Sequence, residues 1–199
     1  MNQDWTGNKT TLFAALGASN HTDTERESYD YYATDPAALD ALMKHKQLPS
    51  VVYECACGAG HLSQVLETHG HKVYSTDLIN RGYGESGIDF LQVQNVPDGC
   101  KCILTNPPYK YTGEFIAHAM DILPEGGEAI YLLNVNILAG QDRFRRFYSK
   151  GLLSDVYLFV KRIKCAKNGL FAATQSSAVN YAWFVFRKGY NGSTLLHWI

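Results

Sequence analysis

The residues with the clearest chemical potential form the tetrapeptide Asn106-Pro107-Pro108-Tyr109, which follows an apolar run ending at Thr105. Proline lacks a backbone N–H and has a fixed φ, so the loop is stiff and presents an amide, carbonyl groups and an aromatic ring. Hydrogen bonds from an exocyclic amine to the Asn106 side-chain oxygen and the Pro107 carbonyl would localise the nitrogen lone pair and make the nitrogen more nucleophilic. Tyr109 could stack on the nucleobase that carries this amine. A base in a duplex must leave the duplex to reach such a pocket. The tetrapeptide therefore predicts an acceptor site for an amino group, in preference to a simple rigid turn.

A glycine-rich turn at 55–60 follows Glu54, which ends a β-rich run, and opens a helix-like segment. Glycine lets the backbone approach a ligand closely and take a positive φ at no steric cost. Asp77 ends the next β-rich run. Its spacing from Gly60 along the sequence is close to the spacing at which an acidic residue accepts hydrogen bonds from the ribose hydroxyls of a nucleoside cofactor. Ser63 stands where a dinucleotide fold has its third glycine, which disfavours a nicotinamide site. An ordinary strand-to-helix connection is the alternative for the turn alone.

Asp89 and Phe90 belong to a third β-rich run, predicted as a strand over 88–93. Asp89 could accept a hydrogen bond from the amino group of an adenine ring, while Phe90 could form an apolar wall against that ring. A strand-end aspartate beside a core phenylalanine is the alternative interpretation.

Alternating strand-like and helix-like segments carry these residues. The Asp35-Pro36 start signal and apolar residues at helical spacing predict helices over 37–46, 61–69, 113–123 and 141–150. Strands are predicted over 51–57, 73–77, 88–93, 100–105, 129–138, 156–160 and 179–186. This alternation predicts an α/β fold, a mostly parallel sheet with helices on both faces, and ligands beyond the carboxyl ends of its strands. The last two strands lack a convincing helix between them, which predicts an antiparallel hairpin at the edge of the sheet.

The length of 199 residues, of which 46% are hydrophobic, predicts a single domain. We expect a polar N-terminal arm over 1–29 and a compact body over 30–199. The 18 basic and 19 acidic residues give a net charge of −1, which excludes binding to nucleic acid through bulk positive charge. The sequence contains neither an apolar run long enough for a membrane span nor a signal-peptide pattern. We therefore expect a cytoplasmic protein with no membrane partner.

Two clusters of basic residues could supply positive charge locally. The first lies at the end of the penultimate strand, before Phe171, where phosphate binding competes with the interpretation of a solvated strand edge. The second lies on the predicted helix over 141–150 and is the weaker candidate, because a charged helix face is usually only solvated. The first cluster is Lys161, Arg162, Lys164 and Lys167, and the second is Arg143, Arg145, Arg146 and Lys150.

The five cysteines are an odd number in a chain long enough to fold without disulfides, so reduced thiols are expected. The pairs Cys55/Cys57 and Cys100/Cys102 would lie on neighbouring strands. Alternate positions on buried strands are typical of small core residues, so we expect no metal site.

These features together resemble the class I S-adenosylmethionine-dependent methyltransferases, and among them the amino-methyltransferases with an Asn-Pro-Pro-Tyr motif. The resemblance covers about 31–189 and implies a Rossmann-like sheet of seven strands, the last antiparallel, in three αβα layers. It also implies S-adenosylmethionine as the cofactor. The cofactor contacts that it implies are Glu54, Ala56, Gly58 and Gly60 in the first loop, Asp77 at the ribose, Asp89 and Phe90 at the adenine, and Tyr32, Ala33, Thr34 and Pro36 at the methionine end.

The whole sequence is most similar to short orphan DNA adenine methyltransferases of phages and prophages, which implies methylation of a flipped adenine at N6 in a bacterial host. This resemblance implies catalytic roles for Asn106, Pro107, Pro108 and Tyr109, with Phe171 against the other face of the base. Larger enzymes of this motif order have a separate target-recognition domain, which we do not expect here. Sequence selectivity would then come from the arm, from a homodimer or from a partner protein, or be weak.

Two other functions stay open. The first is methylation of another planar amine, such as an RNA adenine, a cytosine N4 or a protein glutamine; glutamine methyltransferases usually bring a helical N-terminal domain, for which the arm is too short. The second is a nucleoside-binding module without catalysis, which would need neither Asn106 nor Tyr109.

Overall fold

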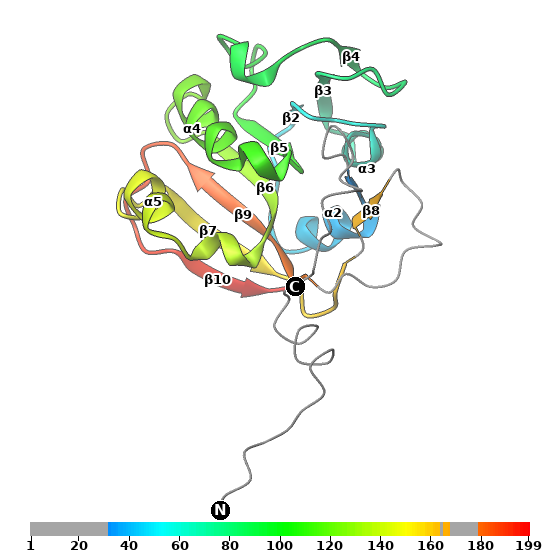
Figure 1. The fold of residues 1–199 in the computed structure, drawn as a ribbon. Helices are drawn as coiled ribbons and strands as arrows, with labels where there is room; N and C mark the ends of the chain where they lie inside the picture. The colour runs from blue at the N-terminus through cyan, green and yellow to red at the C-terminus, as the bar shows by residue number, and fades with distance from the viewer. Residues whose placement is uncertain (1–31, 164, 168–178) are drawn as a thin grey trace, which may run out of the picture.

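A single twisted sheet forms the centre of the protein in the computed structural model, which describes residues 32–163, 165–167 and 179–199. Within these residues the sheet has eight strands in the order β10-β7-β9-β6-β5-β2-β3-β4 (Figure 1). The strands are β2 (Val51–Glu54), β3 (Lys72–Asp77), β4 (Glu85–Ser86), β5 (Cys102–Thr105), β6 (Glu128–Asn134), β7 (Leu153–Leu158), β9 (Tyr181–Arg187) and β10 (Leu195–Trp198).

One strand, β9, runs antiparallel to both of its neighbours, β6 and β7, while the other pairs in the sheet are parallel. The mostly parallel sheet and the antiparallel strand near the end of the chain are confirmed. The position of that strand differs from the prediction, because β9 lies between β6 and β7 and β10 takes the edge. The strand count also rises from the predicted seven to eight, because the strand predicted over 88–93 does not form, while β4 and β10 each add a short strand at an edge of the sheet.

Helices cover both faces of the sheet, which confirms the three-layer arrangement (Figure 1). On one face, α2 (Pro36–Met43) and α3 (His61–Thr68) pack through Leu39, Leu42 and Leu66 against strand residues such as Val52 and Trp183. On the other face, α4 (Thr112–Ile122) and the segment around Phe147 pack against the opposite side chains of the same strands, which include Tyr131 and Phe184. Strand side chains alternate between the two faces, so each strand contributes to both cores.

Local sequence signals explain the start of α2. Pro36 occupies the first helical turn, where its missing N–H costs nothing. The Asp35 side chain accepts a hydrogen bond of 3.0 Å from the backbone N–H of Ala37, which caps the helix. The Trp183 indole N–H donates to the Ala38 carbonyl at 2.9 Å and ties the helix to β9.

Three predicted elements differ from the structure. The strand predicted over 88–93 is the 3-10 helix η1 (Phe90–Gln92), which the Asp89 side chain caps through the Leu91 N–H at 3.0 Å. The strand predicted over 129–138 ends at Asn134 and continues as the 3-10 helix η3 (Val135–Leu138). The helix predicted over 141–150 is a short α5 (Gln141–Arg143) followed by a π-helix, η4 (Phe144–Tyr148).

A small second sheet pairs β1 (Tyr32–Thr34) with β8 (Cys165–Lys167) in an antiparallel register that places Thr34 opposite Cys165. The predicted arm over 1–29 lies outside the described residues, so its boundary stays a prediction. Among the helices of the described residues, none has the length and apolar character needed to cross a membrane.

Candidate active site

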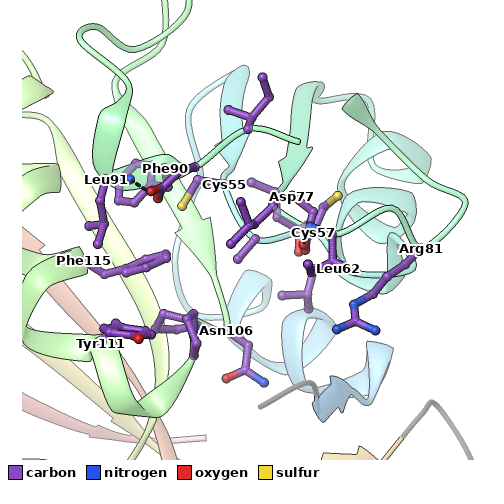
Figure 2. Close-up of a pocket in the computed structure, with 18 of the residues that line it drawn as sticks. Cys55, Cys57, Leu62, Asp77, Arg81, Phe90, Leu91, Asn106, Tyr111 and Phe115 are labelled. Carbon is purple, nitrogen blue, oxygen red and sulfur yellow. Dashed lines mark hydrogen bonds between the residues drawn. The ribbon is translucent and has the colours of Figure 1, made fainter. Parts of the chain in front are cut away.

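A cavity of about 840 Å³ opens at the carboxyl ends of β2, β3 and β5. Figure 2 shows its residues, with Asp77 and Arg81 on one side, Phe90 and Phe115 on the other and Asn106 between them. Half of the predicted site residues line it. These are Thr34, Glu54, Ala56, Asp77, Asp89, Phe90, Asn106, Pro107, Pro108 and Tyr109.

Glu54 is the buried carboxyl group of the cavity, with only 2% of its surface exposed. The Ser63 hydroxyl donates a short hydrogen bond to Glu54 Oε2, and the Ser63 and Ser75 hydroxyl oxygens lie 2.6 Å apart. Burial raises the pKa of Glu54 to about 8, while the hydrogen bond from Ser63 acts in the opposite direction and the charge of Asp77 adds to the rise. The cavity therefore holds a protonated carboxyl group, and a cationic ligand beside it would favour the ionised form.

Asp77 holds the glycine-rich turn against the end of β3. Its Oδ2 accepts a hydrogen bond of 2.7 Å from the Gly58 N–H, and its Oδ1 accepts one of 2.8 Å from the Ile79 N–H. Gly58 and Gly60 have φ values of 56° and 81°, which other residues rarely adopt. A Cβ on Gly60 would also collide with the Tyr83 ring. Both glycines therefore shape the turn from behind the cavity wall.

Phe90 has a structural role as well as a place in the cavity. It is buried, and its ring centre lies 4.9 Å from that of Phe115 and 5.0 Å from the His118 ring. Asp89 caps η1 with Oδ1 and stays exposed to solvent. An apolar wall with an exposed carboxylate at its rim therefore forms one end of the cavity.

The tetrapeptide follows β5 and leads into the 3-10 helix η2 (Tyr109–Tyr111) and α4. The Asn106 side-chain N–H donates to the Thr34 hydroxyl oxygen at 3.1 Å, which links the loop to β1. The Thr112 hydroxyl donates to the Tyr109 carbonyl at 3.0 Å and caps the turn. The Tyr109 and Tyr181 ring centres lie 6.1 Å apart at 31°. Partners from three segments thus fix the position of the loop.

The other predicted residues lie away from the cavity wall or outside the described residues. Ala33 is buried in β1, Pro36 starts α2, and Tyr32 is described only as part of β1. Lys161 and Arg162 are exposed and do not line the cavity. Lys167 is described only as part of β8, while Lys164 and Phe171 lie outside the described residues.

The fold is similar to solved structures of low sequence identity. A protein from Listeria monocytogenes assigned as a class I S-adenosylmethionine-dependent methyltransferase gives a TM-score of 0.56 at 12% identity, covering 96% of this chain and 71% of that one. The chain has a class I methyltransferase fold. A protein from Pyrococcus horikoshii assigned as an RNA methyltransferase gives 0.54 at 15% identity, over 89% of this chain and 97% of that one. The type IIG restriction endonuclease BpuSI gives 0.56 at 15% identity, where 92% of this chain covers 28% of that enzyme. No family model and no curated protein sequence matches the chain.

The cavity lies at the point of this methyltransferase fold where the strand order reverses. After β2 the chain adds β3 on one side, and it later crosses to add β5 on the other side. Loops leaving β2 and β5 therefore diverge and leave a crevice between them, which is where open α/β sheets bind ligands. Residues 55–57 of the glycine-rich turn and the tetrapeptide both line this crevice.

Sequence reasoning missed several residues that line the cavity. Lys110 and Tyr111 directly follow the tetrapeptide, and His61 directly follows the glycine-rich turn, so their proximity was a usable signal. Burial lowers the pKa of His61. Arg81 comes from the loop between β3 and β4 and had no such signal. The remaining lining residues that were missed are apolar or cysteine: Cys55, Cys57, Leu62, Leu78, Ile79, Ile88, Leu91 and Phe115.

The four cysteines with described side chains are buried thiols. Cys57 Sγ donates to the carbonyls of Gly58 and Tyr83, and burial raises its pKa to about 12. Burial also raises the pKa of Cys55 well above its usual value. Thiolates are the metal ligands of cysteine, and the residues with described coordinates contain no cluster of three or more metal-ligating side chains.

Proposed function

We propose that the protein transfers a methyl group from S-adenosylmethionine to the N6 amino group of adenine in DNA. The observation that carries this proposal is that the Asn106–Tyr109 loop and residues 55–57 of the glycine-rich turn line the same cavity. The class I methyltransferase fold supports S-adenosylmethionine as the methyl donor. The resemblance of the sequence to adenine methyltransferases supports DNA adenine as the acceptor.

The side chains of the cavity fit this cofactor. S-adenosylmethionine carries an ammonium group, ribose hydroxyls and a flat adenine ring, which need carboxylates and an apolar wall. Each oxygen of the Asp77 carboxylate accepts one backbone N–H and keeps a lone pair for a ribose hydroxyl. Phe90 and Leu91 would contact the adenine, and Glu54 would face the ammonium group. A cavity of about 840 Å³ also leaves room for an acceptor base beside the cofactor.

The protein then has to position the acceptor amine, because the bound sulfonium supplies an already electrophilic methyl group. Asn106 and the Pro107 carbonyl would accept the two N–H groups of adenine N6 and direct its lone pair at the methyl carbon. In the transfer the amine nitrogen would bond to the methyl carbon as the S–C bond breaks, the electron pair of that bond would stay on sulfur, and the proton released from the nitrogen would pass to solvent. The residues contribute orientation, which is worth several orders of magnitude in rate.

The aromatic residues around Asn106 favour a planar acceptor. Tyr109 and Tyr111 line the cavity beside the Asn106 amide, and Phe115 lies behind them in the core. A planar ring could stack on Tyr109, whereas an aliphatic amine would gain little from these rings. This arrangement supports a base over a non-planar acceptor.

A labelling experiment tests the proposal. The protein is incubated with methyl-labelled S-adenosylmethionine and, separately, unmethylated duplex DNA, RNA and protein, and each product is digested and its modified unit identified. We expect N6-methyladenine from DNA. Label confined to RNA or protein, or to cytosine, would refute the acceptor while leaving methyl transfer intact.

Two alanine variants separate catalysis from folding in the same assay. Asn106→Ala should lose at least about a hundredfold in the rate of transfer, because it removes one of the two groups that orient the amine. Asn136→Ala is the matched control, since Asn136 is exposed in η3 and does not line the cavity. Full activity of Asn106→Ala would refute the mechanism.

A further inference from the structure

A second hollow lies on the segment that follows β6. Leu138 and Phe144 expose 48% and 58% of their surface there, although both are large apolar side chains. The hollow has a volume of about 400 Å³. We call it the Phe144 groove, and it is lined by Leu138, Gly140, Gln141, Phe144, Arg145 and Tyr148.

The wall of the groove is held in place by hydrogen bonds from its own segment. The Tyr148 hydroxyl donates to the Ile137 carbonyl at 2.6 Å. The Arg143 guanidinium donates to the same carbonyl at 3.0 Å and to the Ala139 carbonyl at 2.5 Å. These bonds join η3 to α5 and η4, so the groove exists without a ligand.

Positive charge is concentrated around the groove. Residues 135–150 contain four cations and a single acid, Asp142, which is a formal charge of +3 in a chain whose net charge is −1. Arg146 donates to Asp142 at 3.4 Å. The Arg143 guanidinium is occupied by its hydrogen bonds to the backbone carbonyls of the groove wall. Arg145 and Lys150 are exposed, so their charges face solvent. An exposed aromatic ring beside exposed cations is the combination that proteins use to bind nucleic-acid strands.

The groove is connected to the mouth of the active-site cavity. The Arg146 guanidinium donates to the carbonyl of Gly113, in the first turn of α4, at 3.3 Å. Two residues earlier, Tyr111 exposes 44% of its surface and lines the cavity with Lys110. The segment that carries the groove therefore contacts α4 two residues after Tyr111, which lines the active-site cavity.

We propose that the Phe144 groove binds the DNA strand next to the target adenine, with Arg145 on a backbone phosphate and Phe144 against an unstacked base or sugar. This inference rests on the proposed function, because it assigns a place to the DNA of that reaction. Charge favours DNA over a protein partner, since Arg145 lines the groove together with the apolar side chains and the only acid of this segment, Asp142, already pairs with Arg146. The sequence prediction preferred phosphate contacts at 161–167, whereas this proposal places the contact on Arg145 in η4, which belongs to the basic cluster that was the weaker candidate.

Direct binding tests the groove. Arg145→Ala should weaken the affinity for a fluorescent duplex about fivefold and lower the slope of log affinity against log salt by about 1, as loss of one phosphate contact does. Phe144→Ala should weaken binding by a similar factor with an unchanged salt slope. Lys101→Ala and Leu195→Ala are the matched controls, since both residues are exposed and line neither hollow; they should stay within twofold of wild type.

Kinetics on the same variants separate this inference from the proposed function. We expect Arg145→Ala and Phe144→Ala to raise KM for DNA and to leave KM for S-adenosylmethionine unchanged. If DNA is methylated and both variants bind and react like wild type, the groove is wrong and the function stands. If DNA is not methylated but both variants lose DNA affinity, the function and the place next to a target adenine are wrong, and only DNA binding by the groove stands. Loss of affinity for RNA alone overturns the assignment to DNA.

Discussion

The buried carboxyl group of Glu54 gives the fold a pH dependence that can be predicted in sign and size. Its pKa is raised to about 8 because the side chain is buried and lies near Asp77, against 4.5 for an unburied glutamate. Between these pH values the folded chain keeps a proton that the unfolded chain releases. The folded state therefore binds more protons, and its stability falls as the pH rises through this window.

The size of the effect follows from the two pKa values. A tenfold change in an acid dissociation constant corresponds to about 1.4 kcal/mol, and only the part titrated between pH 5 and pH 8 is observed. Linkage over that interval gives a loss of about 3 to 4 kcal/mol from Glu54 alone. Solvent does not screen this carboxyl group, because its side chain is only 2% exposed. The loss is a large share of the total stability of about 5 to 15 kcal/mol that is usual for a domain.

The variant Glu54→Gln isolates this contribution. The glutamine oxygen can still accept the hydrogen bond from Ser63, but the side chain no longer titrates. Urea unfolding from pH 5 to pH 8 should show the stability of the variant gaining about 3 to 4 kcal/mol on wild type, while groups common to both proteins cancel. Glu114→Gln, at an exposed position of α4, should keep a constant difference from wild type.

The affinity for the cofactor should change with pH in the opposite sense to the stability of the fold. An ammonium group facing Glu54 favours the ionised carboxylate, so the affinity of wild type for S-adenosylmethionine should increase as the pH rises toward 8. Glu54→Gln should bind the cofactor more weakly and without this pH dependence. If the stability difference between Glu54→Gln and wild type does not change from pH 5 to pH 8, the carboxyl group is not protonated in the folded protein and the reasoning fails.

Four further substitutions have defined outcomes. Gly60→Ala should lose about 2 to 4 kcal/mol of stability in thermal unfolding, from a positive φ and a collision with Tyr83. Gly70→Ala should lose only about 1 kcal/mol, because Gly70 also has a positive φ but nothing lies within 4 Å of its Cβ position; equal losses would contradict the collision. Asp77→Ala should raise the dissociation constant of S-adenosylmethionine at least about tenfold by calorimetry, and an unchanged constant would remove Asp77 from the cofactor site. Asn106→Ala should keep that constant within about threefold of wild type while losing transfer.

The layers of the fold were predictable because burial makes apolar residues recur at regular spacings along the sequence. Apolar runs such as 129–133 belong to strands covered on both faces, and Leu62 and Leu66 repeat at helical spacing. These patterns depend only on which residues face the core, so they can be recognised without knowing which strands or helices pack against each other. The pattern fails at β4, whose two residues are both exposed and carry no apolar signal. It also fails at 90–92, where a cap from Asp89 overrides the β-branched neighbours.

The position of β9 shows a different limit. Residues 181–187 have the composition of a strand, and the missing helix before them predicted an antiparallel partner for β7. Nothing local specifies the other neighbour. Insertion beside β6 is decided by seven residue pairs, from Glu128 with Arg187 to Asn134 with Tyr181, which are long-range contacts. The partly buried ion pair of Glu128 and Arg187 at 2.6 Å joins the two strands at one end of this register.

The candidate site was predictable where its residues follow a strand directly. Glu54, Asp77 and Asn106 each stand at the end of a strand or one residue beyond it, and the carboxyl ends of parallel strands meet at one edge. Residues such as Arg81 reach the cavity from a longer loop, and loop paths depend on contacts that short-range patterns do not contain. For the same reason, the Phe144 groove was not predicted, since it requires η3 to fold back against η4.

The choice of acceptor has to reside outside the shared fold. Structures with this fold include proteins assigned as an RNA methyltransferase and a type IIG restriction endonuclease, so the sheet and its crevice are compatible with different substrates. The glycine-rich turn and Asp77 would contact only the cofactor. Discrimination between acceptors must then come from side chains at the outer half of the cavity and beyond it. Under the proposed function the candidates are Lys110 and Tyr111, which line the cavity, and the Phe144 groove, so exchanging these residues should change the substrate before it changes cofactor binding.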